Sequence, residues 1–309
     1  MISYSNLIQH GTVFLKMTGL RVIEFEQLLS DVLPQFEAAE ARRLERADRQ
    51  RALGGGDRPE LVAREQILLT VIWLRLYPTH DVLGYLFGVS QPTVGRYLAH
   101  VLPVLEQAGR DTMRMPDPGR KRRRRLPELL GDIPDLAVVV DSFEQAVQRP
   151  RQAAEGPAWY SGKQHRHTVK SQLTVQEDTG LIAHLSRSVP GRTADITLVK
   201  QSGLLTALPP GTACLADSAY QGIAKLHPLA HSPYKRLGVK PKPLTEAQLA
   251  YNRAFTARRI IVENTIRRIR DYQALNQRDR QHRSLSSHYA RVCAVAGLVN
   301  RQLLHRFSL

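Results

Sequence analysis

Two short apolar runs in the second half of the chain each end directly in an aspartate. Leu136–Val140 precedes Asp141, and Thr212–Ala216 precedes Asp217. Runs of this length and composition predict buried strands of an open α/β sheet, in which binding sites lie beyond the carboxyl ends of the strands. A charged carboxylate at the end of a buried strand is costly unless it is exposed or paired. The two aspartates are therefore candidate ligands of a metal ion at one edge of a sheet.

The spacing of apolar residues changes along the chain. Helical spacing occupies 18–48, 60–77 and 79–105, and alternation over 167–177 and 181–189 predicts a hairpin of two strands. Further helices are expected at about 195–205, from Thr245 past Glu263 toward Tyr272, and at 286–306. Strands followed by alternating strands and helices favour a mixed α/β domain, preceded here by an all-α domain.

The segment 79–105 predicts two helices joined by a tight turn at Gly88–Ser90. Ser90 suits a helix N-cap and Pro92 suits the first helical turn. Such a pair makes a helix-turn-helix, whose second helix enters the DNA major groove; the alternative is an ordinary helical hairpin packed in a core. The residues of the second helix expected to face outward are Gln91, Thr93, Arg96 and Tyr97.

The charge of the chain favours a polyanionic partner. Lys and Arg total 44 against 28 acids, which gives a net charge of +16 and a pI near 10.3. Contacts to phosphates release condensed counterions, so a surplus of this size favours DNA. The run Arg120–Arg125 is either a strap that grips phosphate or a solvated, tail-like segment.

Other classes of protein are disfavoured. Cys214 and Cys293 lie far apart in apolar surroundings, which indicates buried thiols in a reducing compartment. No apolar run approaches the roughly 18 residues that would span a bilayer, so no membrane partner is expected. A cytoplasmic, nucleoid-associated protein fits these features. A two-carboxylate glycosidase remains an alternative that the charge and the sparse aromatic residues argue against.

A third acid, Glu263, lies in a predicted helix rich in arginine. The three-and-four spacing rule places Glu263 on one face with Arg259, Arg267 and Arg270. Phosphodiester transfer suits two divalent ions about 3.5–4 Å apart, and Mg²⁺ or Mn²⁺ prefers hard carboxylate oxygens. The arginines would then hold flanking phosphates. The alternative is that the two aspartates cap turns and that Glu263 only pairs with arginine.

Several blocks resemble the Asp-Asp-Glu (DDE) superfamily of insertion-sequence transposases, in particular the group called insertion-sequence family five. The resemblance covers about residues 18–306, including the predicted helix-turn-helix and the spacing of Arg259, Glu263 and Arg270. Thr256 and Ala194 depart from the Tyr and His that many relatives carry there. The blocks that carry the resemblance are VVVDSFEQAVQRP, WYSGKQHRHTVKSQ, SVPGRTADITL and LADSAYQG.

The resemblance implies a ribonuclease-H-like catalytic domain in which Asp141, Asp217 and Glu263 hold two Mg²⁺ ions, with Mn²⁺ as a substitute. It implies double-stranded DNA as the partner, both element ends and target, and a homo-oligomer on DNA. Lys163 is expected to contact phosphate. The expected reaction is cleavage at terminal inverted repeats followed by strand transfer. An endonuclease that does not integrate DNA and a catalytically dead DNA-binding regulator remain the alternatives.

These interpretations divide the chain into four parts. A loose N-terminal extension precedes a helical DNA-binding domain, and a basic linker leads into the catalytic domain. The expected boundaries are, in that order, 1–17, 18–110, 111–130 and 131–309.

Overall fold

The computed structural model describes residues 1–45, 59–119, 130–131, 133–150, 156–236, 242–280 and 284–307. The chain forms two compact units. The helical unit comprises residues 1–112, 269–277 and 290–309, and the sheet unit comprises residues 113–268 and 278–289. The expected division placed all of 131–309 in one domain, whereas the structure groups two C-terminal segments with the N-terminal helices.

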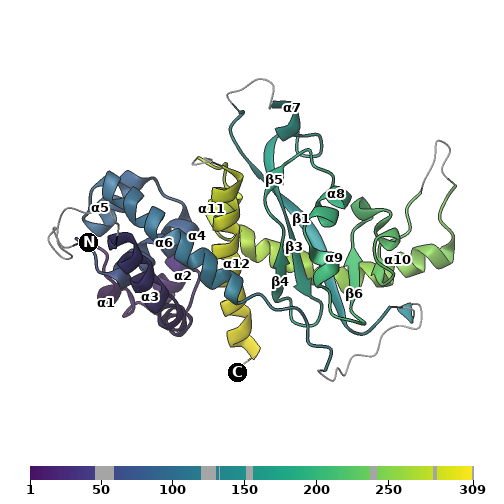
Figure 1. The fold of residues 1–309 in the computed structure, drawn as a ribbon, viewed down its shortest axis with the longest axis horizontal. Helices are drawn as coiled ribbons and strands as arrows, with labels where there is room; N and C mark the ends of the chain where they lie inside the picture. The colour runs from purple at the N-terminus through teal and green to yellow at the C-terminus, as the bar shows by residue number, and fades with distance from the viewer. Residues whose placement is uncertain are drawn as a thin grey trace. The chain divides into compact units, whose positions relative to one another are not determined.

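Helices from both ends of the chain build the helical unit (Figure 1). They are α1 (Tyr4–Leu7), α2 (Gly11–Thr18), α3 (Val22–Leu44), α4 (Ala63–Leu76), α5 (His80–Phe87), α6 (Gln91–Asp111), α11 (Gln273–Asn276) and most of α12 (Leu285–Phe307). Two glycines let α12 lie directly on α6. A Cβ on Gly109 would lie 2.1 Å from the backbone oxygen of Cys293, and one on Gly297 would lie 2.4 Å from the Cα of Gly109. This close backbone approach joins the C-terminal helix to the helical unit.

The expectation that residues 1–17 form a loose extension is wrong. Phe14 is fully buried and its ring packs edge-on against Phe25 with centroids 5.3 Å apart. Tyr4 is also buried, and its backbone N–H donates to the Glu65 carboxylate at 2.8 Å. The aromatic residues of this segment complete the helical core, a contribution that the mixed pattern of the first residues did not indicate.

The predicted helix-turn-helix is confirmed as a structure. Thr79 caps α5 by accepting from the Val82 N–H, and Ser90 caps α6 by accepting from the Thr93 N–H. Gly88 ends α5 with a φ of 73°, a left-handed conformation that glycine adopts without steric cost. These caps end one helix and start the next within a turn of three residues.

A mixed sheet forms the centre of the sheet unit, as the sequence predicted. The strands follow the order β2-β3-β1-β6-β7, and β4 and β5 also pair with β3. β1 is antiparallel to β3 and parallel to β6, which is in turn parallel to β7. Their bounds are β1 (Ala137–Ala146), β2 (Tyr160–Ser161), β3 (Arg166–Gln176), β4 (Ile182–Leu185), β5 (Val189–Pro190), β6 (Ala213–Ala216) and β7 (Ala230–His231).

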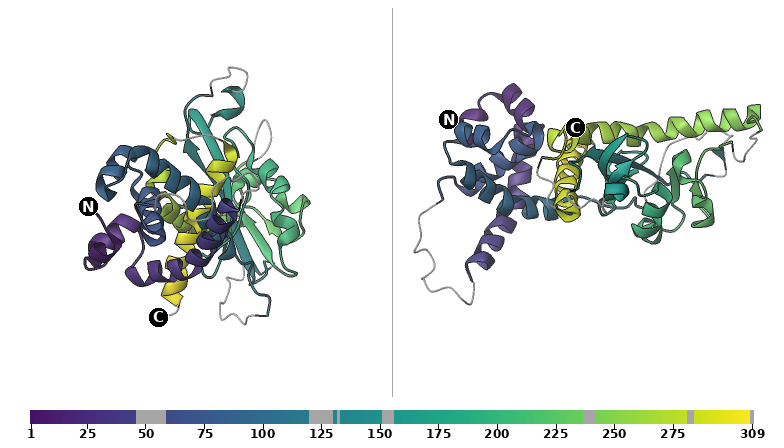
Figure 2. Two further views of the ribbon diagram at one scale, coloured as in Figure 1. Left: turned by 60° about the vertical axis from the view of Figure 1, so that its left-hand side comes forward. Right: turned by 90° about the horizontal axis from the view of Figure 1, so that it is seen from above.

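Helices cover both faces of this sheet (Figures 1 and 2). The long helix α10 (Glu246–Arg270) lies on one face, whereas α8 (Asp195–Gln201) and α9 (Leu204–Ala207) lie on the other. The remaining short helices of the unit are α7 (Gly156–Trp159), η2 (Ser218–Tyr220) and η3 (Ile223–Lys225). The capping box predicted for α10 is present, because Thr245 and Gln248 each accept the other's backbone N–H.

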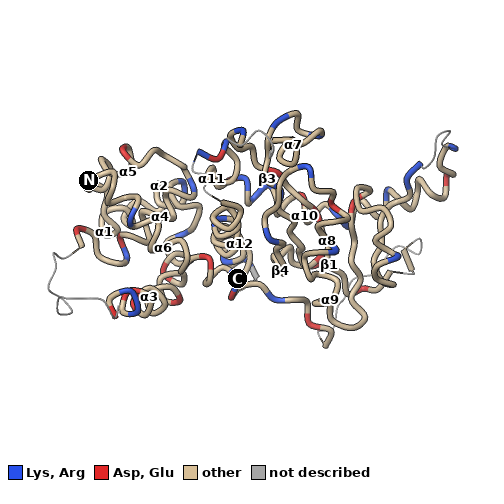
Figure 3. The backbone as a smooth tube through the Cα atoms, turned by 45° about the horizontal axis from the view of Figure 1, so that its top comes forward, with Lys and Arg blue, Asp and Glu red and all other residues tan. Residues whose placement is uncertain are grey.

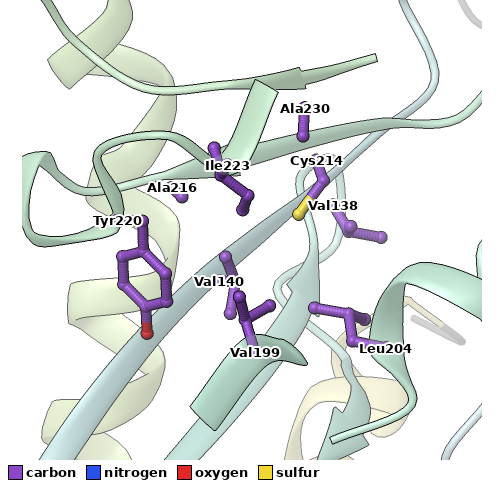
Figure 4. Packing of buried hydrophobic residues seen from close by; sticks show 9 residues of the cluster. All are labelled: Val138, Val140, Val199, Leu204, Cys214, Ala216, Tyr220, Ile223 and Ala230. Carbon is purple, nitrogen blue, oxygen red and sulfur yellow. The ribbon is translucent and has the colours of Figure 1, made fainter. Parts of the chain in front are cut away.

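Alternation along β1 separates the two faces. Val138 and Val140 pack with Cys214 and with residues of α8 and α9 in one buried cluster (Figure 4). The cluster consists of Val138, Val140, Val199, Leu204, Cys214, Ala216, Tyr220, Ile223 and Ala230. Because successive strand side chains point to opposite faces, Asp141 projects to the side that α10 covers.

Two predicted elements are interrupted. The helix expected over 195–205 is divided into α8 and α9 because Gly203 adopts a φ of 75° between them. The strand expected over 181–189 is divided into β4 and β5. In β3, residues 168–175 are buried on both faces, so polar side chains at alternate positions are covered instead of solvated.

Some of the sequence features lie outside the described residues, and others can be compared with the structure. Arg120–Arg125 and Gly54–Gly56 lie outside the described residues, as does part of the basic loop 235–243. Cys214 and Cys293 are buried free thiols, as expected. In the described part of the chain, no helix combines the length and the apolar character that crossing a membrane requires.

Candidate active site

Asp141 and Asp217 stand next to each other where the parallel pairing of β1 with β6 ends. Asp217 follows β6, whereas β1 continues past Asp141 to Ala146, so the expectation that this strand ends at Asp141 is wrong. Val140 of β1 pairs in register with Ala216 of β6, and each aspartate is the next residue along its strand direction. Each carboxylate also accepts a hydrogen bond from the following backbone N–H, at 2.7 Å from Ser142 and at 2.5 Å from Ser218. The register of two buried strands therefore places the two carboxylates side by side, as the sequence predicted.

A guanidinium from α10 bridges the two carboxylates. The Arg259 Nη2 lies 3.4 Å from Asp141 Oδ2, and its Nη1 lies 3.4 Å from Asp217 Oδ1. The Arg259 side chain is 7% exposed, compared with 21% for Asp141 and 36% for Asp217. No acceptor among the described residues reaches the buried Arg259 Nε. Arg259, expected to hold phosphate, thus contacts the aspartates in this structure.

The Asp141 carboxyl is strongly affected by its burial. Burial raises the pKa of Asp141 from 3.8 to about 6, and the nearby charges of Asp217 and Asp195 act in the same direction. The Ser142 N–H and the Arg259 guanidinium oppose this rise in pKa. Burial therefore disfavours the charged form of this carboxyl more than the Ser142 N–H and the Arg259 guanidinium favour it.

Glu263 is not brought into contact with the aspartate pair. It lies one helical turn after Arg259 on α10, and it is exposed. Across the described residues, no three His, Cys, Asp or Glu side chains are placed to hold one metal ion together. Arg267 and Arg270 are also exposed on this helix, along which basic residues recur (Figure 3). Two of the three predicted ligands thus meet in the structure.

On the opposite face of β1, sequence reasoning missed a buried polar network. Lys170 of β3 lies 3.1 Å from Asp195 Oδ1 and 3.6 Å from Glu144 Oε1, and it donates to the Thr193 carbonyl at 2.7 Å. The Ser142 hydroxyl donates to Asp195 Oδ1 at 2.8 Å. The network fixes the start of α8 against the strand that carries Asp141. The sequence signal for this network was Lys170, a lysine within a predicted strand of alternating apolar residues.

The recognition-helix candidates divide into two groups. Gln91 and Arg96 are exposed, as expected. Thr93 and Tyr97 are buried, so the expected outward orientation is wrong for both. The Thr93 hydroxyl accepts from Arg96 Nη2 at 2.9 Å, and the Tyr97 hydroxyl accepts from the Leu61 N–H at 3.2 Å. Both face the core of the helical unit because α6 buries the side that carries Val94 and Val101.

Lys163 is exposed in the turn between β2 and β3. Its neighbour His165 has a φ of 49°, which is uncommon for a residue with a side chain. Lys163 contributes to no described contact with the aspartate pair, so its predicted role in holding phosphate stays a prediction.

Comparisons with known proteins show which family the chain resembles. Residues 140–300 match the family described as DDE superfamily endonuclease, and residues 59–111 match the helix-turn-helix of DDE superfamily endonuclease. The protein named "Probable transposase for insertion sequence element IS702", from Microchaete diplosiphon, is 30% identical over 259 residues, which are 84% of this chain and 87% of that protein. "Putative nuclease HARBI1" of Rattus norvegicus is 26% identical over 191 residues, or 60% of this chain and 51% of that protein. No solved structure matches the chain.

The family matches coincide with the structural features. The endonuclease match begins one residue before Asp141 and includes Asp217 and Glu263. The second match includes all of α5 and α6. Together with the identity to the insertion-sequence relative, these matches show that the chain belongs to the DDE superfamily of endonucleases and carries the helix-turn-helix of that superfamily.

Proposed function

We propose that this chain is the DNA transposase of an insertion sequence. It cuts DNA at the terminal inverted repeats of the element and joins the freed ends to target DNA. The insertion-sequence relative, aligned over 84% of the chain, supports this proposal. The single observation that carries it is the adjacency of Asp141 and Asp217, because neighbouring carboxylates positioned by two paired strands suit metal-dependent phosphodiester chemistry.

We further propose two Mg²⁺ ions as cofactor, with Mn²⁺ as a substitute, held by Asp141, Asp217 and Glu263. The donor set fits, because the two aspartates already face one cation, Arg259, at 3.4 Å each. Mg²⁺ usually takes only one or two protein carboxylates, completing its shell with water and substrate phosphate oxygens. Once bound, a pair of divalent ions activates the attacking oxygen and stabilises the leaving oxygen of an in-line displacement.

The side chains of the site have separate roles in this proposal. The backbone N–H groups of Ser142 and Ser218 orient the Asp141 and Asp217 carboxylates. Glu263 is included as the third ligand because it lies one helical turn from Arg259, which contacts both aspartates. Water attacks the scissile phosphate first, and the released 3′-hydroxyl then attacks the target strand, so no covalent bond between protein and DNA is formed.

The DNA contacts are proposed on both units. Gln91 and Arg96 are exposed on α6, where a recognition helix would present them to base edges in the major groove. Their neighbours Thr93 and Tyr97 support that helix from its buried side. The cations proposed to hold phosphates are Lys163, Arg259, Arg267 and Arg270.

The cellular setting and the assembly follow from this function. We propose that the protein acts in the cytoplasm on the nucleoid, and as a homo-oligomer that holds both element ends. We also propose a ribonuclease-H-like fold for the sheet unit. Its support is a central β1 that is antiparallel to β3 and parallel to β6, with aspartates following β6 and within β1.

A cleavage and joining assay tests the function. The purified chain is incubated with labelled duplexes carrying the ends that flank its own gene, a supercoiled target plasmid, and either Mn²⁺ or EDTA. Metal-dependent nicks at the ends and labelled DNA joined to the plasmid are the expected products. Tight binding to the ends without nicks in any divalent metal would contradict the proposal and favour a DNA-binding regulator.

A second candidate is a nuclease of this superfamily that cuts without joining. The similarity to "Putative nuclease HARBI1", at 26% identity, favours it. The same assay separates the two functions, because the nuclease gives nicked ends and no labelled plasmid. A short duplication of target sequence on both sides of the gene would favour the transposase.

A further inference from the structure

Two consecutive arginines of α10 make very different ion pairs. Arg258 donates to both oxygens of Glu177, at 2.9 Å from Nε and 2.6 Å from Nη2, and both side chains are almost fully buried. Arg259 reaches Asp141 and Asp217 with one nitrogen each, and both distances are 3.4 Å. A charge-assisted hydrogen bond normally measures about 2.7–2.9 Å. Arg258 is therefore locked into a forked pair, whereas Arg259 is held loosely.

The two long contacts of Arg259 are made to a pair of carboxylates whose charges require a nearby cation. Asp141 and Asp217 are neighbouring carboxylates that directly follow the paired residues Val140 and Ala216, and like charges so placed repel each other. The Arg259 guanidinium offsets this repulsion from a side chain that is 7% exposed, although its Nε finds no acceptor among the described residues. The Arg259 guanidinium gives only one nitrogen to each carboxylate, so neither ion pair is bidentate. It therefore uses only part of the hydrogen-bonding capacity of an arginine.

We propose that Arg259 is a placeholder cation: it holds Asp141 and Asp217 together before divalent ions bind, and it yields that position to them. This inference rests on the proposed metal-dependent function. It adds that the guanidinium and the divalent ions compete for the same carboxylate oxygens. The displaced guanidinium then becomes available to a DNA phosphate, which couples cation binding to contact with the substrate.

The proposal predicts that removing the Arg259 guanidinium lowers the stability of the metal-free protein and raises its affinity for divalent ions. Removing the guanidinium leaves the two carboxylates uncompensated, so the metal-free protein loses thermal stability. The same removal frees oxygens that divalent ions need, so affinity for the ions rises. A residue with a purely structural role would lower stability and leave metal affinity unchanged or reduced. The combination therefore identifies a positioning residue that competes with the metal.

The test measures Mn²⁺ binding by calorimetry and thermal unfolding in EDTA, without DNA, for the full chain. Arg259→Gln is compared with Arg253→Gln, which removes one exposed cation of the same helix and contacts neither aspartate. Arg259→Gln is expected to bind Mn²⁺ roughly three- to tenfold more tightly than Arg253→Gln, the range that corresponds to the loss of two long, weak ion pairs. It is also expected to unfold at a lower temperature in EDTA.

Equal or weaker Mn²⁺ binding by Arg259→Gln than by Arg253→Gln would overturn the inference. If the parent still binds Mn²⁺ and Asp141→Asn abolishes that binding, the proposed metal site survives this failure. If neither the parent nor any variant binds Mn²⁺, the inference and the proposed metal chemistry fail together. Should Arg259→Gln not fold, Arg259→Lys keeps the charge without the two-pronged bridge and is expected to bind Mn²⁺ more tightly than the parent; unchanged binding would count against the inference.

Discussion

Val140 and Ala216 pair in parallel register, and this one pairing fixes the spacing of the two aspartates that follow them. Both residues are fully buried, and both belong to the cluster that α8 and α9 cover. The positions of the Asp141 and Asp217 carboxylates are therefore set by strand packing instead of by a loop. A site built on strands keeps its geometry, which suits chemistry that requires two fixed ligands.

The raised pKa of Asp141 predicts a pH dependence of stability in EDTA. The pKa is about 6 in the folded protein and 3.8 as the ordinary value, so the folded state binds more protons between these limits. The free energy of unfolding should therefore fall as pH rises from 4 to 6, by at most about 3 kcal/mol. Urea unfolding at several pH values measures this fall in the free energy of unfolding. Asp141→Asn should remove most of this slope, and an unchanged slope in that variant would assign it to another group.

Lys170 is predicted to be essential for stability. Lys170→Met leaves Glu144 and Asp195 with side chains that are 7% and 16% exposed and without their shared cation. Breaking a buried pair in this way costs about 3–5 kcal/mol. Urea unfolding of Lys170→Met is compared with Lys163→Met, in which an exposed lysine is expected to change stability by less than about 0.5 kcal/mol. Similar values for both variants would contradict the predicted role of the network.

The N-terminal segment is predicted to be part of the folded core. Phe14→Ala should lower the free energy of unfolding by about 3–5 kcal/mol, because the ring is fully buried against Tyr4 and Phe25. The neighbouring Val13 is 47% exposed and serves as the matched site. Val13→Ala should have little effect on thermal unfolding. Equal losses at the two positions would argue that the segment packs differently.

Arg96 is predicted to contact DNA through α6. Arg96→Ala should weaken binding to the element ends, by about 1–3 kcal/mol if the guanidinium contacts a base edge. A phosphate contact instead would lower the slope of log affinity against log salt by about one and weaken binding to all sequences. Lys16→Ala removes an exposed cation of α2, outside the helix-turn-helix, and should leave affinity for the ends unchanged. Binding is measured by fluorescence anisotropy at several salt concentrations.

The sequence was sufficient for features whose cause is local. A few adjacent residues specify the buried strand that leads into Asp141, the N-cap at Ser90 and the capping box of Thr245, and the structure confirms these features. The end of that strand was not predicted correctly, because β1 continues past Asp141 to Ala146. The aspartate pair was also predictable, because two apolar runs that pair as parallel strands bring the residues that follow them together. Local patterns therefore gave the elements and the carboxylates that two of them position.

Features that depend on distant packing were not predictable. Tyr97 has the helical position of a DNA-facing residue, yet its hydroxyl bonds the Leu61 backbone, 36 residues away. The grouping of α12 with the N-terminal helices depends on Gly109 and Gly297, which look unremarkable in sequence. Arg259 was predicted to bind phosphate because helical spacing indicates which face of the helix carries a residue, but not which group that residue contacts.

The most direct test of the account is strand cleavage by three proteins on the same labelled element ends in Mn²⁺. The parent is compared with Asp217→Asn and with Asp178→Asn, which alters an exposed aspartate of the sheet unit away from the pair. The account predicts that Asp217→Asn binds the ends like the parent and produces no nicks, whereas Asp178→Asn cuts normally. Nicking by Asp217→Asn at the parental rate would contradict a catalytic role for the aspartate pair.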